Sequence, residues 1–247
     1  SITLDVGGPV HVADYGGAGA PMLLVHGLGG HHVNWLPVAP TLSSSFRVYA
    51  VDLPGFGRSP AHGRPHTITA NVGVIGNLLE QLSEEPAVLM GNSMGGLISM
   101  GVATRHPKNV AALVLVDPAL PAPSRLSFNA VTARFLVAYA APWLGRRQLR
   151  RIAARHGPEV IIRQTLELCT VDIRRIDPAV IEAHIEEERM RQQIEGWDEP
   201  FFAAARSIVS TLAVRGRVER WIRGITAPTL LVQGRKDRLV SYRSARA

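Results

Sequence analysis

The sequence predicts an α/β fold: a mostly parallel sheet with helices on both faces and a helical segment inserted late in the chain. Short continuous apolar runs, typical of strands buried on both faces, alternate with longer stretches of helical character. The alternation stops between Asp117 and Pro228, where no convincing strand run occurs. A length of 247 residues is sufficient for one large domain with such an insertion.

The predicted elements follow one another in the order that a parallel sheet requires. An antiparallel hairpin, formed by residues 2–6 and 10–15, opens the chain. The later apolar runs predicted to be strands are 22–25, 47–51, 87–90, 111–116 and 229–232. Helices are expected over 35–42, 67–82 and 97–106, and from Tyr242 onward. Alternation of this kind builds a sheet covered by helices on both faces.

Residues 119–224 are predicted to form a helical cap inserted into a core made of residues 1–118 and 225–247. Prolines divide this segment into short pieces. Asp177-Pro178 is a typical helix start before residues 179–193. The cap contains 17 arginines against 12 acidic residues, a composition typical of solvated helix faces and also compatible with anionic substrates or partners.

Composition excludes several classes of protein. The N-terminal residues lack a signal-peptide pattern, and no apolar run reaches the roughly 18–20 residues that span a bilayer. The net charge is +7, but no basic run with interleaved aromatic residues indicates nucleic-acid binding. Because Cys169 is the single cysteine, no internal disulfide forms, and we expect it to be small, buried and inert. We expect a cytoplasmic protein without stable membrane insertion.

The stretch Gly91-Asn92-Ser93-Met94-Gly95 lies between a predicted strand and a predicted helix. Gly-x-Ser-x-Gly at such a junction is typical of a nucleophile elbow, a sharp turn that lifts a serine hydroxyl above the sheet edge. The glycines on either side of Ser93 leave room for a strained backbone. Free N–H groups at the start of the helix favour negative charge nearby. Ser93 is therefore the candidate nucleophile.

Further motifs occur in order at other predicted strand ends. They are His26-Gly27-Leu28-Gly29, Asp52-Leu53-Pro54-Gly55-Phe56-Gly57-Arg58-Ser59 and Gly234-Arg235-Lys236-Asp237. With the elbow, they make the chain resemble the α/β-hydrolases of the capped esterase and epoxide-hydrolase-like group, over nearly its whole length outside the cap. Serine at the elbow argues against epoxide hydrolases and haloalkane dehalogenases, which need a carboxylate nucleophile. The resemblance implies the α/β-hydrolase fold but no particular substrate.

The resemblance also implies roles for individual residues. Ser93 would attack the substrate, and the backbone N–H groups of Leu28 and Met94 would form the oxyanion hole. Asp237 would orient the catalytic histidine, and Asp117, at the end of the preceding strand, is the rival acid.

Other polar residues of the motifs are expected to be structural. The ring of His26 would bond loop backbone, and Asp52 would organise the Pro-Gly loop. His31 and His32 are expected in a loop or at the pocket rim, and Trp35 in the core or the pocket wall.

The catalytic histidine is the point at which the chain departs from the family. The family order is Ser, acid, His, but all nine histidines precede Asp237. We expect the final strand, the histidine and the last helix to lie outside these 247 residues, because without them a long hydrophobic edge would be exposed. His106, His156 and His184 are interpreted as surface or cap residues.

Three functions are compatible with these residues. The first is hydrolysis of a carboxylic ester of a small to medium substrate through an acyl-enzyme on Ser93. The second is carbon–carbon hydrolysis of ring-cleavage diketo acids, because the elbow 91–96 is very similar to that group's. The third is a non-catalytic ligand-binding member of the fold, if no downstream histidine exists. Large cap residues favour an apolar substrate; they are Phe128, Phe135, Leu136, Trp143, Phe201 and Phe202.

No cofactor is expected. The sequence has no Gly-x-Gly-x-x-Gly after its first strand, and no Cys-x-x-Cys spacing that would indicate a metal site. The expected partner is a small-molecule substrate rather than nucleic acid, and the sequence leaves a homo-oligomer open.

Overall fold

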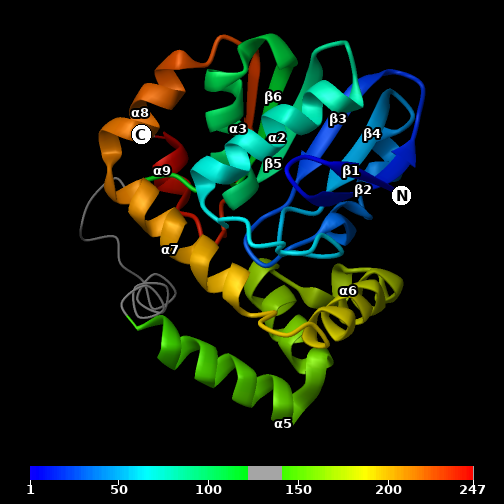
Figure 1. The fold of residues 1–247 in the computed structure, drawn as a ribbon, viewed down its shortest axis with the longest axis vertical. Coiled ribbons are helices and arrows are strands. Elements are labelled where there is room, and N and C mark those ends of the chain that lie inside the picture. Colours follow the sequence, from blue (N-terminus) through cyan, green and yellow to red (C-terminus); the bar gives the residue numbers. More distant parts are fainter. Residues whose placement is uncertain (122–140, 247) are drawn as a thin grey trace.

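The computed structural model of the protein describes residues 1–121 and 141–246 (Figure 1). Its centre is a sheet with the strand order β1-β2-β4-β3-β5-β6-β7. The strands are β1 (Ile2–Asp5), β2 (Pro9–Gly16), β3 (Ala20–Val25), β4 (Phe46–Val51), β5 (Ala87–Asn92), β6 (Val110–Val116) and β7 (Thr229–Val232). β2 pairs antiparallel with β1 and β4, and the remaining pairs are parallel. The predicted α/β fold is confirmed.

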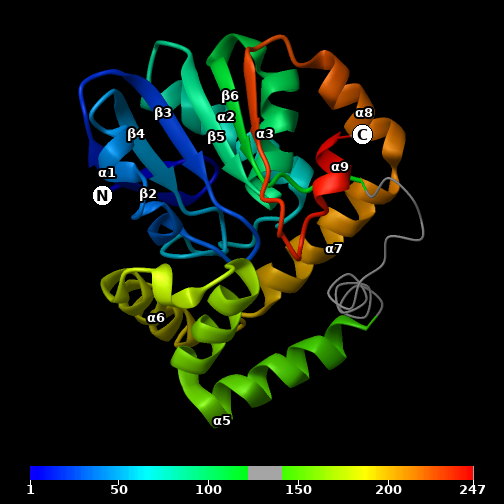
Figure 2. The ribbon, with the colours of Figure 1, turned by 180° about the vertical axis from the view of Figure 1, so that it is seen from behind.

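Helices cover both faces of the sheet. On one face, α2 (Ile68–Leu82) and α3 (Met94–Arg105) pack against each other and against the strands (Figures 1 and 2). On the other face lie the 3-10 helix η1 (His32–Trp35) and the short helix α1 (Ala39–Leu42). Alternate residues of β3 therefore enter different clusters, because successive side chains of a strand point to opposite faces.

The helix expected over residues 35–42 is only partly formed. The structure has η1 and α1 there, separated at Leu36–Val38. Pro37 and Pro40 explain the break, since a proline ring removes a backbone donor and disfavours a helical conformation at the preceding residue. By contrast, α2 has no internal proline, and Thr67 caps it by accepting a hydrogen bond from the N–H of Ala70.

The inserted segment is helical where it is described. It contains α5 (Pro142–Cys169), which bends at Gly157, the 3-10 helix η3 (Ile173–Arg175), α6 (Pro178–Gln192), α7 (Glu199–Ala213) and α8 (Arg215–Gly224). In Figure 1, α5 and α6 lie beyond one end of the sheet, whereas α7 leads back to it. Ala204, Val218 and Trp221 of α7 and α8 belong to the main core cluster. The boundaries 119 and 224 stay predictions.

The last described elements lie at one edge of the sheet. β7 pairs with β6, and its residues Leu230, Leu231 and Val232 are exposed. The short helix α9 (Tyr242–Arg246) follows it. Among the described helices, none combines the length and the hydropathy that a membrane span requires.

Candidate active site

Ser93 lies on the turn between β5 and α3. Its backbone has φ 51° and ψ −112°, a conformation that residues other than glycine rarely adopt. The two glycines of the motif are needed for close backbone contacts. A Cβ at Gly91 would lie 2.4 Å from the carbonyl oxygen of Gly95, and a Cβ at Gly95 would lie 2.1 Å from that of Val25. The structure thus has the strained strand–turn–helix geometry that the sequence predicts.

Hydrogen bonds from neighbouring segments hold this turn. The N–H of Ser93 donates to the carbonyl oxygen of Val116 (3.0 Å), and its own carbonyl oxygen accepts from Leu97 (3.1 Å) and Ala119 (3.0 Å). The side-chain amide of Asn92 also donates to Val116 O (3.1 Å). Because β6 and α3 fix the turn on both sides, the strained conformation at Ser93 is maintained by its surroundings.

The loop that carries Leu28 lies against the elbow. A Cβ at Gly27 would lie 3.3 Å from the Cβ of Ser93. Met94 is the first residue of α3, where backbone N–H groups have no acceptor within the helix. The two backbone segments predicted to form an oxyanion hole therefore meet at Ser93. The hole itself stays a prediction.

A pocket of about 440 Å³ lies beside Ser93. Its walls come from the ends of β5 and β6, the end of α5 and the loop after β7; the described lining residues are Asn92, Ser93, Asp117, 168–171 and 234–240. None of the nine histidines is among them. The described part of the pocket therefore brings the hydroxyl of Ser93 together with two carboxyl groups, without an imidazole.

Asp117 and Asp237 both line this pocket. Asp117 accepts a hydrogen bond from the N–H of Gly234 at 2.6 Å. Burial raises the pKa of Asp117, and the charge of Asp237 raises it further against the opposing effect of the Gly234 N–H. Asp237 accepts hydrogen bonds from the N–H groups of Leu239 (2.7 Å) and Val240 (3.0 Å). The choice of Asp237 over Asp117 as the catalytic acid stays a prediction.

Cys169 differs from its prediction. It is the last residue of α5, is exposed and lines the pocket. Partial desolvation by the pocket walls, together with the charge of Asp237, raises the pKa of its thiol. The expectation of a buried cysteine is wrong, because α5 ends at the pocket instead of inside the core. The raised pKa nevertheless agrees with an inert thiol.

His26 is structural, as expected. Its ring is fully buried; Nδ1–H donates to the carbonyl oxygen of Gly27 (2.7 Å), and Nε2 accepts from the N–H of Leu53 (3.0 Å). Burial lowers the pKa of His26, so the ring is neutral and both nitrogens are used. It joins the loop of Leu28 to the Pro-Gly loop.

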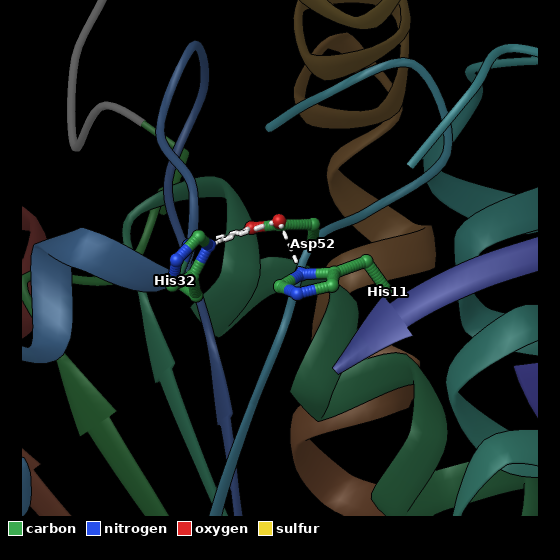
Figure 3. Close-up of side chains that lie close together, drawn as sticks. All are labelled: His11, His32 and Asp52. Atoms are coloured by element: carbon green, nitrogen blue, oxygen red, sulfur yellow. Dashed lines mark hydrogen bonds and ion pairs between the residues drawn. The ribbon is translucent and has the colours of Figure 1, made fainter. Parts of the chain in front are cut away.

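Asp52 organises the Pro-Gly loop, as expected, and is also the centre of a buried cluster. Its carboxylate accepts from the N–H of Arg58 (3.0 Å), and its carbonyl oxygen accepts from the hydroxyl of Ser59 (2.6 Å). Figure 3 shows the carboxylate between the rings of His11 and His32, whose Nδ1 atoms lie 2.8 and 3.0 Å from Oδ2. Burial opposes ionisation of Asp52, but these two hydrogen bonds outweigh it and hold its pKa below the ordinary value.

The histidines of this region are more buried than the sequence indicates. His31 lies in the loop before η1, as expected, and His32 begins η1; they are 6% and 8% exposed, and neither is among the described lining residues of the pocket. Trp35 is buried, as expected for the core. His184 is a cap residue, as expected, but it is also buried and lies 3.3 Å from His31. Short-range spacing could not show this pairing, because 153 positions separate the two residues.

Comparison with known proteins agrees with this architecture. The family model described as the alpha/beta hydrolase fold matches residues 20–247, which include the elbow, the loop of Leu28 and Asp237. The chain belongs to the α/β-hydrolase family. The predicted resemblance is thereby confirmed.

Several members of the family are similar in sequence over part of their length. Lipase LipV of Mycobacterium tuberculosis is 42% identical over 112 residues, which are 45% of this chain and 42% of the lipase. A dihydrolipoyllysine-residue acetyltransferase component of the acetoin cleaving system of Pseudomonas putida is 30% identical over 234 residues, 94% of this α/β-hydrolase and 55% of that protein. The 2-hydroxymuconate semialdehyde hydrolase of a Pseudomonas species is 42% identical over 111 residues, 42% and 38% of the two chains. The chain spans about half the length of these curated relatives.

Solved structures show the same fold. A serine hydrolase involved in carbazole degradation has a TM-score of 0.71 and 24% identity, covering 99% of this α/β-hydrolase and 83% of that chain. A membrane phospholipase A has a TM-score of 0.65 and 25% identity, covering 96% and 70% of the two chains.

Proposed function

We propose that this α/β-hydrolase is a serine hydrolase that cleaves a carboxylic ester of a small to medium apolar substrate through an acyl-enzyme on Ser93. The observation that carries the proposal is the position of Ser93, on a strained turn at the start of α3 and beside a pocket of about 440 Å³. A hydroxyl in this position can reach a bound carbonyl group, and the helix N-terminus favours the charge that develops there.

The proposed reaction has two steps. The Oγ of Ser93 attacks the carbonyl carbon while a histidine takes its proton, and the N–H groups of Leu28 and Met94 donate to the oxyanion. The tetrahedral intermediate then expels the alcohol, which receives the proton. In the second step, the same general base takes a proton from water, which attacks the acyl group. The second tetrahedral intermediate then collapses, releases the acid and restores the hydroxyl of Ser93.

The pocket contains a candidate for the acid of this mechanism but, among its described lining residues, none for the base. Asp237 lies in the pocket and follows β7 in the sequence motif, so we assign it to orient the histidine. None of the nine histidines is among the described lining residues. We therefore keep the expectation that the imidazole belongs to sequence outside these 247 residues.

An apolar substrate is supported by part of the pocket wall. Leu168, Val171, Leu239 and Val240 line it, and the ring of Phe201 lies beside the loop of Leu28, 3.1 Å from where a Cβ at Gly29 would be. Of the other large residues of the prediction, Trp143 is 65% exposed, Phe202 is buried, and Phe128, Phe135 and Leu136 lie outside the described residues.

Carbon–carbon hydrolysis of a diketo acid is the second candidate. Arg235 and Lys236 line the pocket and would favour a substrate carboxylate. The relative named as a 2-hydroxymuconate semialdehyde hydrolase supports the same class. However, the loop from His26 to Gly29 lacks the Gly-Pro-Gly extension often found in that group.

Turnover of p-nitrophenyl esters and of a vinylogous diketo acid would separate the two candidates. We expect the esters to be hydrolysed faster, and Ser93→Ala to lower kcat by at least about 10³-fold. Ser210→Ala, which changes an exposed serine of α7, is the matched control and should leave kcat unchanged. A phosphonate probe should label wild-type protein on Ser93 only. Absence of both turnover and labelling would support a ligand-binding protein instead.

The two carboxylates of the pocket can be distinguished in the same assay. We expect Asp237→Asn to lower kcat by about 10⁴-fold, the effect of removing the orienting acid from a triad. Asp117→Asn should have a much smaller effect, because Asp237, and not Asp117, occupies the acid position of the Gly-x-x-Asp motif after β7. A larger loss in Asp117→Asn, with folding of both variants verified by circular dichroism, would assign the acid to Asp117.

A further inference from the structure

A second group of buried titratable side chains lies where the cap meets the core. His31 and His32 precede and begin η1, whereas His184 and Glu187 are three residues apart on α6 and therefore share one face of that helix. These four side chains belong to residues that are between 4% and 8% exposed. They come from segments far apart in the sequence, which is why the short spacings tested in the sequence did not indicate a metal site.

The side chains are spaced as ligands of one ion. A ring nitrogen of His31, a ring nitrogen of His32 and a carboxylate oxygen of Glu187 lie within 4.8 Å of one another. The Nε2 of His32 and the Oε1 of Glu187 are 3.9 Å apart, which is too long for a hydrogen bond. Two ligands of the same metal ion lie at about this separation, since each metal–ligand bond is about 2.0–2.2 Å.

Asp52 determines which nitrogen of His32 is available. The Nδ1 of His32 lies 3.0 and 3.1 Å from the two carboxylate oxygens, so Nδ1–H donates to Asp52 and Nε2 is the nitrogen left for another partner (Figure 3). The Nε2 of His32 faces Glu187, whose Oε1 also accepts hydrogen bonds from the guanidinium of Arg58. A histidine held by a carboxylate through its other nitrogen is the usual arrangement around a protein-bound metal.

His31 supports the same conclusion. Its Nδ1 is buried without a hydrogen-bond partner among the described residues, and its Nε2 lies 3.3 Å from the Nδ1 of His184. An orphaned buried nitrogen is uncommon and indicates an unseen partner.

The group formed by His11, His32 and Asp52 is a weaker candidate, although its ligand atoms are also close together. Direct hydrogen bonds of 2.8 and 3.0 Å already join both rings to Asp52. No further cation is needed there, and Asp52 serves to hold His32.

We propose that His31, His32 and Glu187 bind one divalent transition-metal ion of the Zn²⁺ type, with His184 holding the ring of His31. Two imidazoles and one carboxylate suit Zn²⁺ and its neighbours, whereas Mg²⁺ and Ca²⁺ prefer oxygen ligands only. Arg58, which donates two hydrogen bonds to Oε1 of Glu187, orients this carboxylate. The ion joins α6 of the cap to the segment that follows the loop of Leu28. This binding does not depend on the reaction proposed for Ser93.

Calorimetric titration of the EDTA-treated full chain with ZnCl₂ tests the proposal. We expect saturation at one equivalent per chain, an increase of Tm with Zn²⁺ and no response to MgCl₂. Glu187→Gln should lower the Zn²⁺ affinity by at least about tenfold. His156→Gln, which changes an exposed histidine of α5, is the matched control and should bind like wild type.

His31→Gln is a second variant that guards the test against a folding defect at Glu187. Circular dichroism without metal identifies which of the two variants is folded. Co²⁺ bound to wild type should give a visible absorption band that each folded variant weakens. Absence of a one-equivalent site in wild type, or unchanged affinity in a folded Glu187→Gln or His31→Gln variant, would overturn the proposal.

Discussion

The core around the elbow and the cap are stabilised by different interactions. Leu23, Leu89 and Leu97 of the core belong to one large cluster in which most side chains are fully buried. In the cap, Ile162, Ile181 and Ile185 form a much smaller cluster. Apolar packing is insensitive to pH and salt, whereas interactions between charges depend on both. The difference therefore indicates that the position of Ser93 is fixed under conditions that would loosen the cap.

Ion pairs connect the helices of the cap to each other and to the core, in addition to the small apolar cluster. Asp198, which is fully buried before α7, accepts hydrogen bonds from Arg146 (2.9 Å) and Arg150 (2.6 Å) of α5. Arg58 of the core pairs with Glu187 of α6 at 2.6 Å. Each of these pairs joins two segments that are separate in the sequence.

The largest effect is expected for a substitution at the elbow. Gly95→Ala would place a Cβ 2.1 Å from the carbonyl oxygen of Val25, so the backbone must shift in a region that cannot relax. We expect a loss of more than about 3 kcal/mol in the free energy of unfolding, or no soluble protein. Urea denaturation followed by circular dichroism measures it.

Gly73→Ala is the matched control, because a Cβ at Gly73 meets no described atom within 4 Å. Gly73 lies inside α2, where alanine is a better helix former, and the change should stabilise the protein by up to about 1 kcal/mol. Similar losses in both variants would show that backbone entropy, and not close contact, explains the glycine at position 95.

A pair of truncations compares the two hydrophobic clusters directly. Leu89→Ala removes a fully buried side chain of β5 and should cost about 4 kcal/mol, whereas Ile185→Ala in the cap should cost about 2 kcal/mol. The smaller cluster can collapse more easily around the missing atoms. Equal losses in urea denaturation would mean that the cap is packed as firmly as the core.

The sequence predicted the core well because the parallel strands β3, β5, β6 and β7 have continuous apolar runs and the predicted turns have their glycines or prolines. The elbow is the clearest example. A Cβ at Gly91 would meet the carbonyl oxygen of Gly95, and a Cβ at Gly95 would meet that of Val25 on the neighbouring strand β3. The helix expected over 35–42 is only partly formed, because Pro37 and Pro40 interrupt a segment whose other residues favour a helix.

The buried polar cluster could not be predicted in the same way. His31 and His184 meet only because α6 folds back onto η1, and no local pattern encodes that contact. The exposure of Cys169 also depends on where α5 ends relative to the pocket. Long-range packing decides both, whereas periodicity and spacing report on neighbours in the chain.

The smallest expected effect concerns the charges inside the cap. We expect Asp198→Asn to cost about 1–2 kcal/mol at pH 7, because one buried carboxylate loses its charge while both guanidinium groups stay partly exposed to water. Glu159→Gln, which removes a charge from the exposed pair with Arg163 on α5, is the control and should change stability by less than about 0.5 kcal/mol.

The pH dependence of the stability difference between wild type and Asp198→Asn tests whether the charge of Asp198 causes this difference. Burial opposes ionisation of Asp198, but hydrogen bonds from Arg150 and Arg146 outweigh it and hold its pKa below the ordinary value. A carboxylate with a lowered folded-state pKa binds fewer protons in the folded than in the unfolded chain, so its contribution is complete above about pH 4 and is lost as the pH falls further. Urea denaturation of wild type and Asp198→Asn between pH 3 and 7 should therefore show a constant difference down to about pH 4 and a shrinking one below. A difference that persists unchanged at pH 3 would mean that the shape of the side chain, and not its charge, holds α5 against the start of α7.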